Sequence, residues 1–464
     1  MSAHRALTLA LAPLLAAAAA GPAQASLWSL FSAEEASKSA EIVRPARGRT
    51  VFLVTTASDV EVRPGTSDQV RLTAELEYSS RDEAWMKEVE KTFRLEATET
   101  DKELRLRPVL PQPAGRTKVS YALNLQLEVP RGTPLEIEDQ YGDVSVADTQ
   151  GPVRVTSSSG DVSVKGAKGM VRLDVRYGDI EVESVAGGLE VAGSSGDVAA
   201  QRIRGPVTVR TSYGDMSIND VDGPLTIESS SGDVAVQKSG KNVVVRSSYG
   251  SIAVAEIAGD AEVRSSSGDI AVERVTGALT VESSYGSVAV ERVGGRVNIT
   301  SQSGGIVAEQ IGAGGTLRCA YGDVMVQGAG GAITIQGTSG SVAASDIGGD
   351  VQVNSQYGGV HLENVRGAVT VSAQNGPVSV SGLSGPALNA SHRVETSYAD
   401  VEFEWPASAG LQFQLQSADG HVESDFPGTS RESGGNRVIE GSSGRGSGSV
   451  RLSSRGGSVI LHKM

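Results

Sequence analysis

Apolar and polar residues alternate along most of the chain, and the alternation restarts at a fixed interval. Tyr-Gly pairs recur every 36 residues with Ser-Gly or Asn-Gly pairs midway between them, so the interval is 18 residues. The grid glycines are Gly142, Gly160, Gly178, Gly196, Gly214, Gly232, Gly250, Gly268, Gly286, Gly304, Gly322, Gly340, Gly358 and Gly376. An apolar residue lies two positions after each of them and another lies four positions after, as at Val144 and Val146.

Each 18-residue unit also contains a second alternating pair, such as Val207 and Val209, and one apolar residue between the pairs, such as Val185. Short alternating runs rich in β-branched residues and bounded by glycine predict strands. One unit cannot bury its apolar face alone, but stacked units can. The pattern therefore predicts an all-β parallel β-helix (β-solenoid) of about 14 rungs over residues 137–390. The repeat is not the six-residue one of left-handed hexapeptide helices, which favours a right-handed solenoid.

The tyrosines of the Tyr-Gly pairs follow the inward phase of the second strand. Tyr213 continues the series Val207, Val209 and Thr211, and the next unit has Ser231 at the same offset. We predict that large and small residues alternate inside the stack, with each ring packed over its smaller neighbour. The alternative is an exposed aromatic ladder that stacks on sugar rings.

Both ends of the array depart from the grid. Residues 26–136 have longer alternating stretches and predict an amino-terminal β capping domain, with one short helix within Arg81–Phe93. Residues 391–464 predict irregular rungs and a second cap. There Tyr398 comes five residues late, and the Gly/Ser-rich segment Glu432–Ser449 is expected to be a loop or partly disordered. Val450–Leu452 with Val459–Leu461 resemble a rung.

The first residues indicate export. Arg5 precedes an apolar run from Ala6 to Ala20 and then Ala23-Gln24-Ala25, the pattern of a signal peptide over residues 1–25. We therefore expect the mature chain in the periplasm, in the cell envelope or outside the cell. No second long apolar segment predicts a membrane span. The formal net charge of −14 argues against nucleic acid as a partner. With Cys319 as its only cysteine, the chain can form no internal disulfide.

Aspartates that follow grid glycines are the main candidates for a site. Six lie on consecutive rungs: Asp143, Asp161, Asp179, Asp197, Asp215 and Asp233. We interpret them as caps of turn amides, and we expect these amides and nearby arginines such as Arg176 and Arg210 to offset the repulsion between neighbouring carboxylates. The alternative is a carboxylate ladder that binds Ca²⁺. Cys319 aligns with Thr211 and predicts a small buried residue. His361, His392, His421 and His462 form no metal-binding or catalytic spacing. No catalytic residue and no cofactor is predicted.

Several motifs resemble a bacterial cell-envelope family of β-strand-repeat domains of unknown function that carries an adhesin label. They are Leu127-Glu-Val-Pro-Arg-Gly-Thr-Pro-Leu-Glu-Ile137, which leads to Tyr141-Gly-Asp-Val-Ser-Val146, the repeated Ser-Ser-Gly-Asp-Val-x-Val units, and Gly420-His-Val-Glu-Ser-Asp-Phe426. The resemblance implies a non-catalytic scaffold whose rigid surface binds an unidentified macromolecule or glycan. Two alternatives stay open: a polysaccharide-acting β-helix enzyme (a lyase or hydrolase) and a calcium-binding repeat protein. Equal intervals throughout the array leave no inserted loops to build a cleft, which favours the scaffold.

Overall fold

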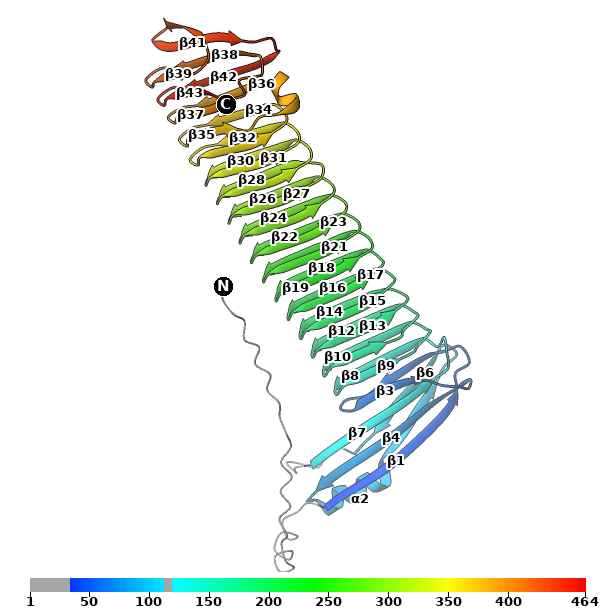
Figure 1. Cartoon of the computed structure of the whole chain (residues 1–464). Coiled ribbons are helices and arrows are strands. Elements are labelled where there is room, and N and C mark those ends of the chain that lie inside the picture. The colour runs from blue at the N-terminus through cyan, green and yellow to red at the C-terminus, as the bar shows by residue number, and fades with distance from the viewer. Residues whose placement is uncertain (1–33, 112–118) are drawn as a thin grey trace, which may run out of the picture.

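The chain folds into a rod of stacked rungs, as the computed structural model shows for residues 34–111 and 119–464 (Figure 1). The expected signal peptide lies outside the described residues. Each rung contributes one strand to sheet A and one to sheet B, and each strand pairs in parallel with the strand 18 residues further on. The predicted β-solenoid of about 14 rungs is confirmed.

The two sheets share the same arrangement over the regular array. Sheet A contains β9 (Val144–Ala147), β11 (Val162–Lys165), β13 (Ile180–Val185), β15 (Val198–Ile203), β17 (Met216–Val221), β19 (Val234–Ser239), β21 (Ile252–Ile257), β23 (Ile270–Val275), β25 (Val288–Val293), β27 (Ile306–Ile311), β29 (Val324–Ala329), β31 (Val342–Ile347), β33 (Val360–Val365) and β35 (Val378–Ser381). Sheet B contains β8 (Leu135–Tyr141), β10 (Val153–Ser159), β12 (Val171–Tyr177), β14 (Leu189–Ser195), β16 (Val207–Tyr213), β18 (Leu225–Ser231), β20 (Val243–Tyr249), β22 (Ala261–Ser267), β24 (Leu279–Tyr285), β26 (Val297–Ser303), β28 (Gly315–Tyr321), β30 (Ile333–Ser339), β32 (Val351–Ser355) and β34 (Val369–Ala373).

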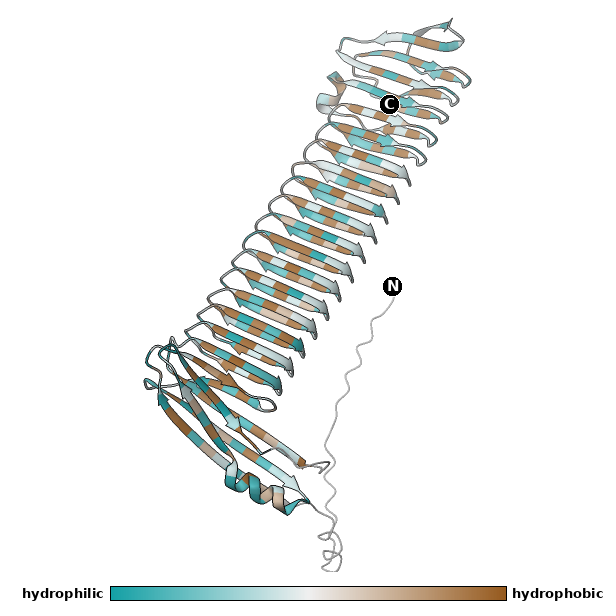
Figure 2. Ribbon diagram, turned by 180° about the vertical axis from the view of Figure 1, so that it is seen from behind, coloured by the Kyte–Doolittle hydropathy of each residue, from teal (hydrophilic) through white to brown (hydrophobic). Residues whose placement is uncertain are grey.

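The core lies between the two sheets as columns of aliphatic side chains. Val207 pairs in register with Leu225, and Leu225 pairs with Val243, so one inward position stacks on the same position of the next rung. All three side chains are buried. Apolar and polar residues alternate along each strand in Figure 2, as the sequence predicted. An apolar side chain in such a column contributes about 1.5–3 kcal/mol through burial.

A left-handed residue in each sheet A strand changes the side-chain phase. The sixth residue after each grid glycine has positive φ, for example Ser184 at 58° and Arg274 at 56°. Val182 and Val185 are therefore both buried, although three residues separate them. Non-glycine residues rarely adopt this conformation, which costs about 1–3 kcal/mol unless the surroundings impose it. The same conformation recurs at this position in every rung of the regular array, so the rungs stacked on either side stabilise it.

The amino-terminal domain continues both sheets beyond the first rung. β2 (Thr50–Val54) pairs in parallel with β8, and β3 (Asp59–Pro64) pairs in parallel with β9. β6 (Glu103–Val109) and β7 (Val119–Val129) then pair in parallel with β2 and β3. Two further rungs therefore precede the grid, although loops and strands of the cap interrupt them in the sequence.

Antiparallel strands complete this cap. β4 (Gln69–Ser80) pairs with β7, β1 (Glu34–Pro45) pairs with β4, and β5 (Arg94–Glu99) pairs with β6. The predicted helix forms as α2 (Glu83–Thr92), where Asp82 Oδ1 accepts the amides of Ala84 and Trp85. Among the described residues, no helix has both the length and the apolar character needed to cross a membrane.

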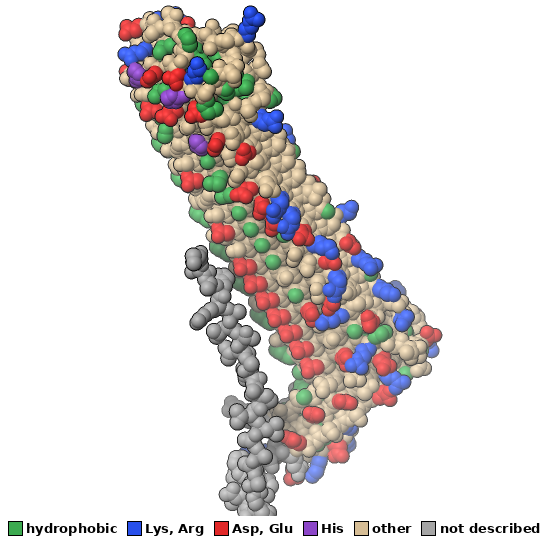
Figure 3. Space-filling view, viewed as in Figure 1, with side chains coloured by type: hydrophobic (Ala, Val, Ile, Leu, Met, Phe, Trp, Pro, Cys, Tyr) green, Lys and Arg blue, Asp and Glu red, His purple; other side chains and the backbone are tan. Residues whose placement is uncertain are grey.

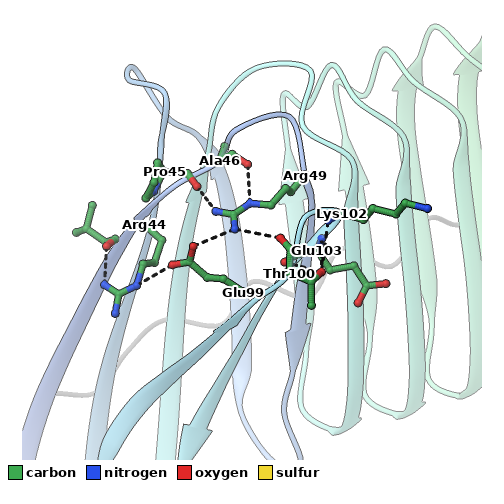
Figure 4. Close-up of polar contacts among 9 residues, drawn as sticks. Arg44, Pro45, Ala46, Arg49, Glu99, Thr100, Lys102 and Glu103 are labelled. Carbon is green, nitrogen blue, oxygen red and sulfur yellow. Dashed lines mark hydrogen bonds and ion pairs between the residues drawn. The ribbon is translucent and has the colours of Figure 1, made fainter.

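Arg49 ties the strands of this cap together (Figure 4). Its guanidinium is almost fully buried and donates to the carbonyls of Pro45 and Ala46, which close the turn between β1 and β2. It also reaches the β5–β6 hairpin, where Nη1 lies 2.9 Å from Oε2 of Glu99 and close to the carbonyl of Thr100. This hydrogen bond lowers the pKa of Glu99. The sequence alone does not distinguish Arg49 from the other arginines.

At the carboxy-terminal end, the last two strands insert between earlier ones. β42 (Gly448–Ser454) lies between β36 (Ser391–Thr396) and β38 (Leu411–Ser417). In the same way, β43 (Val459–Lys463) lies between β37 (Val401–Trp405) and β39 (Val422–Ser424). The rung predicted at Val450–Leu452 and Val459–Leu461 is therefore confirmed, and the last rung in sequence is not the last in space.

The Gly/Ser-rich segment Glu432–Ser449 is not the predicted loop. It contains β41 (Asn436–Ser443), which pairs with β40 (Gly428–Ser433) on one side and with β38 on the other. Gly434 and Gly435 both have positive φ, which a two-residue hairpin turn requires. Val438 on β41 is buried, so an apolar contact holds the hairpin over the end of the rod.

His392 lies inside this carboxy-terminal cap. Its Nδ1 accepts the amide of Val369, its Nε2 donates to the carbonyl of Ala387 at 2.8 Å, and its ring meets Phe403 and Trp405 edge-on. Burial lowers the pKa of this imidazole, because the charged form is poorly solvated there. His392 is therefore a neutral structural residue, joined to the 3₁₀ helix η1 (Gly385–Asn389) that precedes β36.

Candidate functional site

The candidate site is the edge of the rod where each sheet B strand turns into the next sheet A strand. Twelve of the fourteen grid glycines make this turn with a positive φ, 114° at Gly232, and the exceptions are Gly358 and Gly376 near the end of the array. A Cβ on Gly232 would lie 2.0 Å from the carbonyl oxygen of Gly214, and a Cβ on Gly250 would lie 2.2 Å from that of Gly232. Both the conformation and the close stacking therefore require glycine. Gly214, Gly232 and Gly250 therefore stack on one another on successive rungs, as expected for grid positions of a solenoid.

The tyrosines before these glycines are exposed, so the prediction that they pack inside the stack is wrong. Each tyrosine of this row exposes between 56% and 65% of its residue surface. We call the row the tyrosine ladder; it consists of Tyr141, Tyr177, Tyr213, Tyr249, Tyr285, Tyr321, Tyr357 and Tyr398. Thr211, two residues before Tyr213, is the last side chain of the strand that points into the core, because the glycine turn brings the two sheets together there. The side chain of Tyr213 lies on the same side of the strand but projects beyond the edge of the core into water.

Beneath the ladder, small polar residues close the core. Ser247 and Ser265 are buried, and each hydroxyl donates to the backbone carbonyl two residues further on. Cys319 occupies this column and is buried, as predicted, with its Sγ near the carbonyls of Gly304 and Gly322. Burial raises the pKa of its thiol, which makes it a poor nucleophile.

Asp139 occupies the same column, in register with Ser157 of the next rung. Its carboxylate is buried, and neither oxygen meets a hydrogen-bond donor in good geometry. Burial outweighs the nearby amides of Gln140 and Tyr141, and the charges of Asp59 and Asp143 add to it, which raises the pKa of Asp139 to about 6. A charged carboxylate cannot donate to a carbonyl as the serines of this column do, whereas a protonated one can.

The predicted aspartates form a second row beside the tyrosines, visible as a diagonal line of acidic side chains in Figure 3. This aspartate ladder consists of Asp143, Asp161, Asp179, Asp197, Asp215 and Asp233. The backbone amide of Asp161 donates to Oδ1 of Asp143 at 2.9 Å, and the pattern repeats on each rung until Ser251 donates to Asp233. The interpretation as amide caps is therefore confirmed. Each cap joins two rungs across the turn.

A calcium site needs several oxygen ligands around one ion. Within residues 34–111 and 119–464, no group of three or more His, Cys, Asp or Glu side chains is placed to hold a metal ion. Nor does Arg210 neutralise the aspartate ladder, because its Nε pairs with Glu228 at 2.9 Å on the outer face of sheet B. The amides, and not this arginine, offset the repulsion between neighbouring carboxylates.

A groove of about 750 Å³ lies where the cap meets the rod, along the first aspartates of the ladder. Carboxylates and amides line it, including Glu61, Glu75, Glu181 and Gln126, but it has no His, Lys or Arg in its lining. If the chain were a polysaccharide-acting enzyme, this groove would be its substrate cleft. His361, His421 and His462 lie elsewhere, each near one carboxylate, at Glu363, Glu423 and Asp425.

Comparison with known proteins shows a family and a similarity to solved structures. The model of the family Toastrack DUF4097 matches residues 49–256, 219–321 and 313–462, which together span nearly all of the described chain. The crystal structure of a protein from Clostridium sporogenes, described only provisionally as a cell adhesion protein, is similar over 92% of this chain and 100% of its own, with 9% identity and a TM-score of 0.18. The chain matches no curated protein.

Proposed function

Since the chain belongs to the Toastrack DUF4097 family and folds as a regular β-solenoid, we propose that it is a non-catalytic scaffold of the cell envelope, in the manner of an adhesin. Its tyrosine ladder is the surface that it presents to another macromolecule. Export follows from the expected signal peptide over residues 1–25, and the negative charge of the chain disfavours nucleic acid as the partner.

The exposure of the tyrosine ladder is the observation that carries this proposal. A tyrosine leaves more than half of its side chain in water at every second rung, although burying the ring would stabilise the fold. Aromatic residues are over-represented where proteins bind other molecules, because one side chain supplies a large apolar face and a polar tip. A regular row of them is therefore better explained by binding than by packing.

The regular array supports a scaffold over an enzyme. Consecutive grid glycines are equally spaced, so no loop extends from the array to enclose a substrate. Polysaccharide cleavage needs an acid and a base in different environments or a cation that polarises the substrate. The groove at the cap is lined by carboxylates, amides, hydroxyls and aliphatic side chains, and its lining has no lysine, arginine or histidine that could bind an acidic sugar.

Co-sedimentation with insoluble envelope material tests the proposal. We expect the mature chain to sediment with it, and a variant with all ladder tyrosines replaced by serine to stay in solution. Serine occupies the same position on alternate rungs, as at Ser195 and Ser231, so the variant should keep its fold, which circular dichroism checks. Tyr121→Ser is the matched control, since Tyr121 is exposed on the cap outside the ladder. Equal sedimentation of all variants, or release of soluble sugars by the mature chain, would contradict the scaffold proposal.

A further inference from the structure

The spacing of the tyrosine ladder restricts what can bind along it. Tyr213 pairs in register with Ser231, and Ser231 pairs with Tyr249, so the rings recur at every second rung. Two strand spacings are about 9.6 Å, and the whole ladder is about 67 Å long. A ligand that uses the ladder must be extended and must repeat the same face at this interval.

The spacing is kept where the sequence repeat fails. Ala373 of β34 pairs with Thr396 of β36, which places Tyr398 two rungs beyond Tyr357 although the sequence interval is five residues longer. The extra residues form the loop with η1, which lies before β36 and away from the tyrosine edge. The ladder therefore continues in register into the carboxy-terminal cap.

The groups around the rings are those that recognise sugars. Serine hydroxyls lie between the rings at Ser195 and Ser231 and beside them at Ser212 and Ser230. The carboxylates of the aspartate ladder lie on the other side along the first rungs, two residues after Tyr141, Tyr177 and Tyr213, and serine takes this position after Tyr249 and Tyr285. Aromatic faces pack against the C–H face of a pyranose, while hydroxyls and carboxylates hydrogen-bond to its hydroxyl groups.

An extended glycan joined by equatorial bonds fits the interval. Each sugar in a β-1,4-linked chain advances by about one strand spacing and is flipped relative to the one before, so the same face recurs at every second sugar, as the tyrosines do at every second rung. From this match we propose that the tyrosine ladder binds an uncharged β-1,4-linked glycan chain, with one disaccharide unit to each tyrosine. This inference rests on the proposed scaffold function, because it names the partner of the same edge.

Other occupants fit less well. Side chains on one face of an extended peptide recur at about 6.8 Å, which does not match the ladder. A proline-rich helix repeats at about 9.3 Å but offers few donors to the serine and aspartate groups. A second copy of this chain would bring two aspartate ladders together, and an acidic glycan would meet the same carboxylates, so both are repelled.

Calorimetry with cello-oligosaccharides of two, four and six sugars tests the assignment on the mature chain. We expect the affinity to rise with length, at least about tenfold from the disaccharide to the hexasaccharide, because successive units meet successive rings. The variant Tyr177→Ser/Tyr213→Ser/Tyr285→Ser/Tyr357→Ser leaves no two successive rings of the ladder, so it should lose at least about tenfold in hexasaccharide affinity, and Tyr121→Ser should stay within about twofold.

A variant with the same number of tyrosines at a different spacing tests whether binding depends on the interval between the rings or only on their number. Tyr213→Ser/Ser231→Tyr and Tyr321→Ser/Ser339→Tyr together keep the number of tyrosines but move two rings by one rung, so no three successive rings keep the original interval. We expect this variant to bind the hexasaccharide as weakly as the four-serine variant does. Hexasaccharide binding at the wild-type level would overturn the match between rings and disaccharides.

Further measurements distinguish a failure of the glycan assignment from a failure of the scaffold proposal. Tyrosine-dependent sedimentation with envelope material, without any binding of cello-oligosaccharides, would overturn the glycan assignment and leave the scaffold standing. Tyrosine-dependent binding of oligoproline or polygalacturonate in place of cello-oligosaccharides would overturn it in the same way. Self-association lost in the four-serine variant, measured by analytical ultracentrifugation, would show that a second copy occupies the ladder.

Discussion

At the scale of single residues, side-chain direction follows from strand phase until the chain turns. Val236 points inward and is buried, whereas Ala235 points outward and is exposed. The same reasoning placed Tyr213 inside the stack, and it failed because Gly214 turns the chain immediately afterwards. Phase along a strand can be predicted from the sequence, but the residue at which the turn ends the core depends on how closely the two sheets approach.

Val236→Asp tests the inward phase. It would bury an unpaired carboxylate between apolar neighbours on the rungs above and below, so we expect a loss of more than about 4 kcal/mol in the free energy of unfolding. Ala235→Asp places the same group in water and should change stability by less than about 0.5 kcal/mol. Chemical denaturation measures both. Similar losses in the two variants would show that the assigned phase is wrong.

Asp139 predicts a pH dependence with a definite sign. Its pKa is raised from 3.8 to about 6 in the folded chain, so folding is favoured when the carboxyl is protonated. That contribution is complete below about pH 4 and is lost as the pH rises through about 6, and the difference amounts to about 3 kcal/mol. Asp139→Ser supplies the hydroxyl found in other rungs. Compared with wild type, it should therefore gain up to about 3 kcal/mol more at pH 7.5 than at pH 4. An equal effect at both pH values would contradict the burial of a charged group at this position.

At the scale of elements, the repeat defined the strands but not the ends of the rod. The grid predicted the register of sheets A and B because identical positions must stack. It did not reveal that β2 and β3 form a rung next to β8 and β9, although most of the cap lies between these strands in the sequence. Nor did it reveal that β42 and β43 insert between earlier strands. Those pairings join residues far apart in sequence, and periodicity carries no information about them.

Two local features also escaped prediction. The left-handed residue of each sheet A strand is Ser184, Arg202 or Lys238 in different rungs, so no residue type marks it. Gly434 and Gly435 do mark a hairpin, since Gly-Gly between strands is a turn signal. Composition argued for a loop there, because the surrounding serines and glycines hide the short strand that buries Val438.

The turn between the sheets gives a prediction about the aspartate ladder. If its carboxylates act by capping amides, Asp179→Asn/Asp197→Asn should change the free energy of unfolding only slightly. Each asparagine oxygen can still accept the one backbone N–H that the aspartate accepted, and the repulsion between neighbouring carboxylates falls. We expect millimolar Ca²⁺, compared with chelator at matched ionic strength, to leave the melting temperature of the mature chain unchanged. A rise of many degrees with Ca²⁺ that disappears in the double variant would make this turn a metal site.

At the scale of the whole molecule, stacked rungs convert a short repeat into a straight line of equivalent groups. Each rung adds one position to every column, so a side chain selected once per 36 residues becomes a row along the rod. Both ends are covered by strands that differ from the array, which protects open sheet edges from joining other chains. Length, direction and spacing of the tyrosine ladder therefore follow from rung geometry alone.

The central claim is that the tyrosines form one straight, rigid row, and distances between spin labels test it most directly. Labels at Tyr177→Cys paired with Tyr249→Cys, Tyr285→Cys or Tyr321→Cys, in a Cys319→Ser background, lie four, six and eight rungs apart. We expect narrow distributions near about 19, 29 and 38 Å, growing by one strand spacing per rung. Broad distributions, or distances that do not grow in proportion to the number of rungs, would contradict the claim.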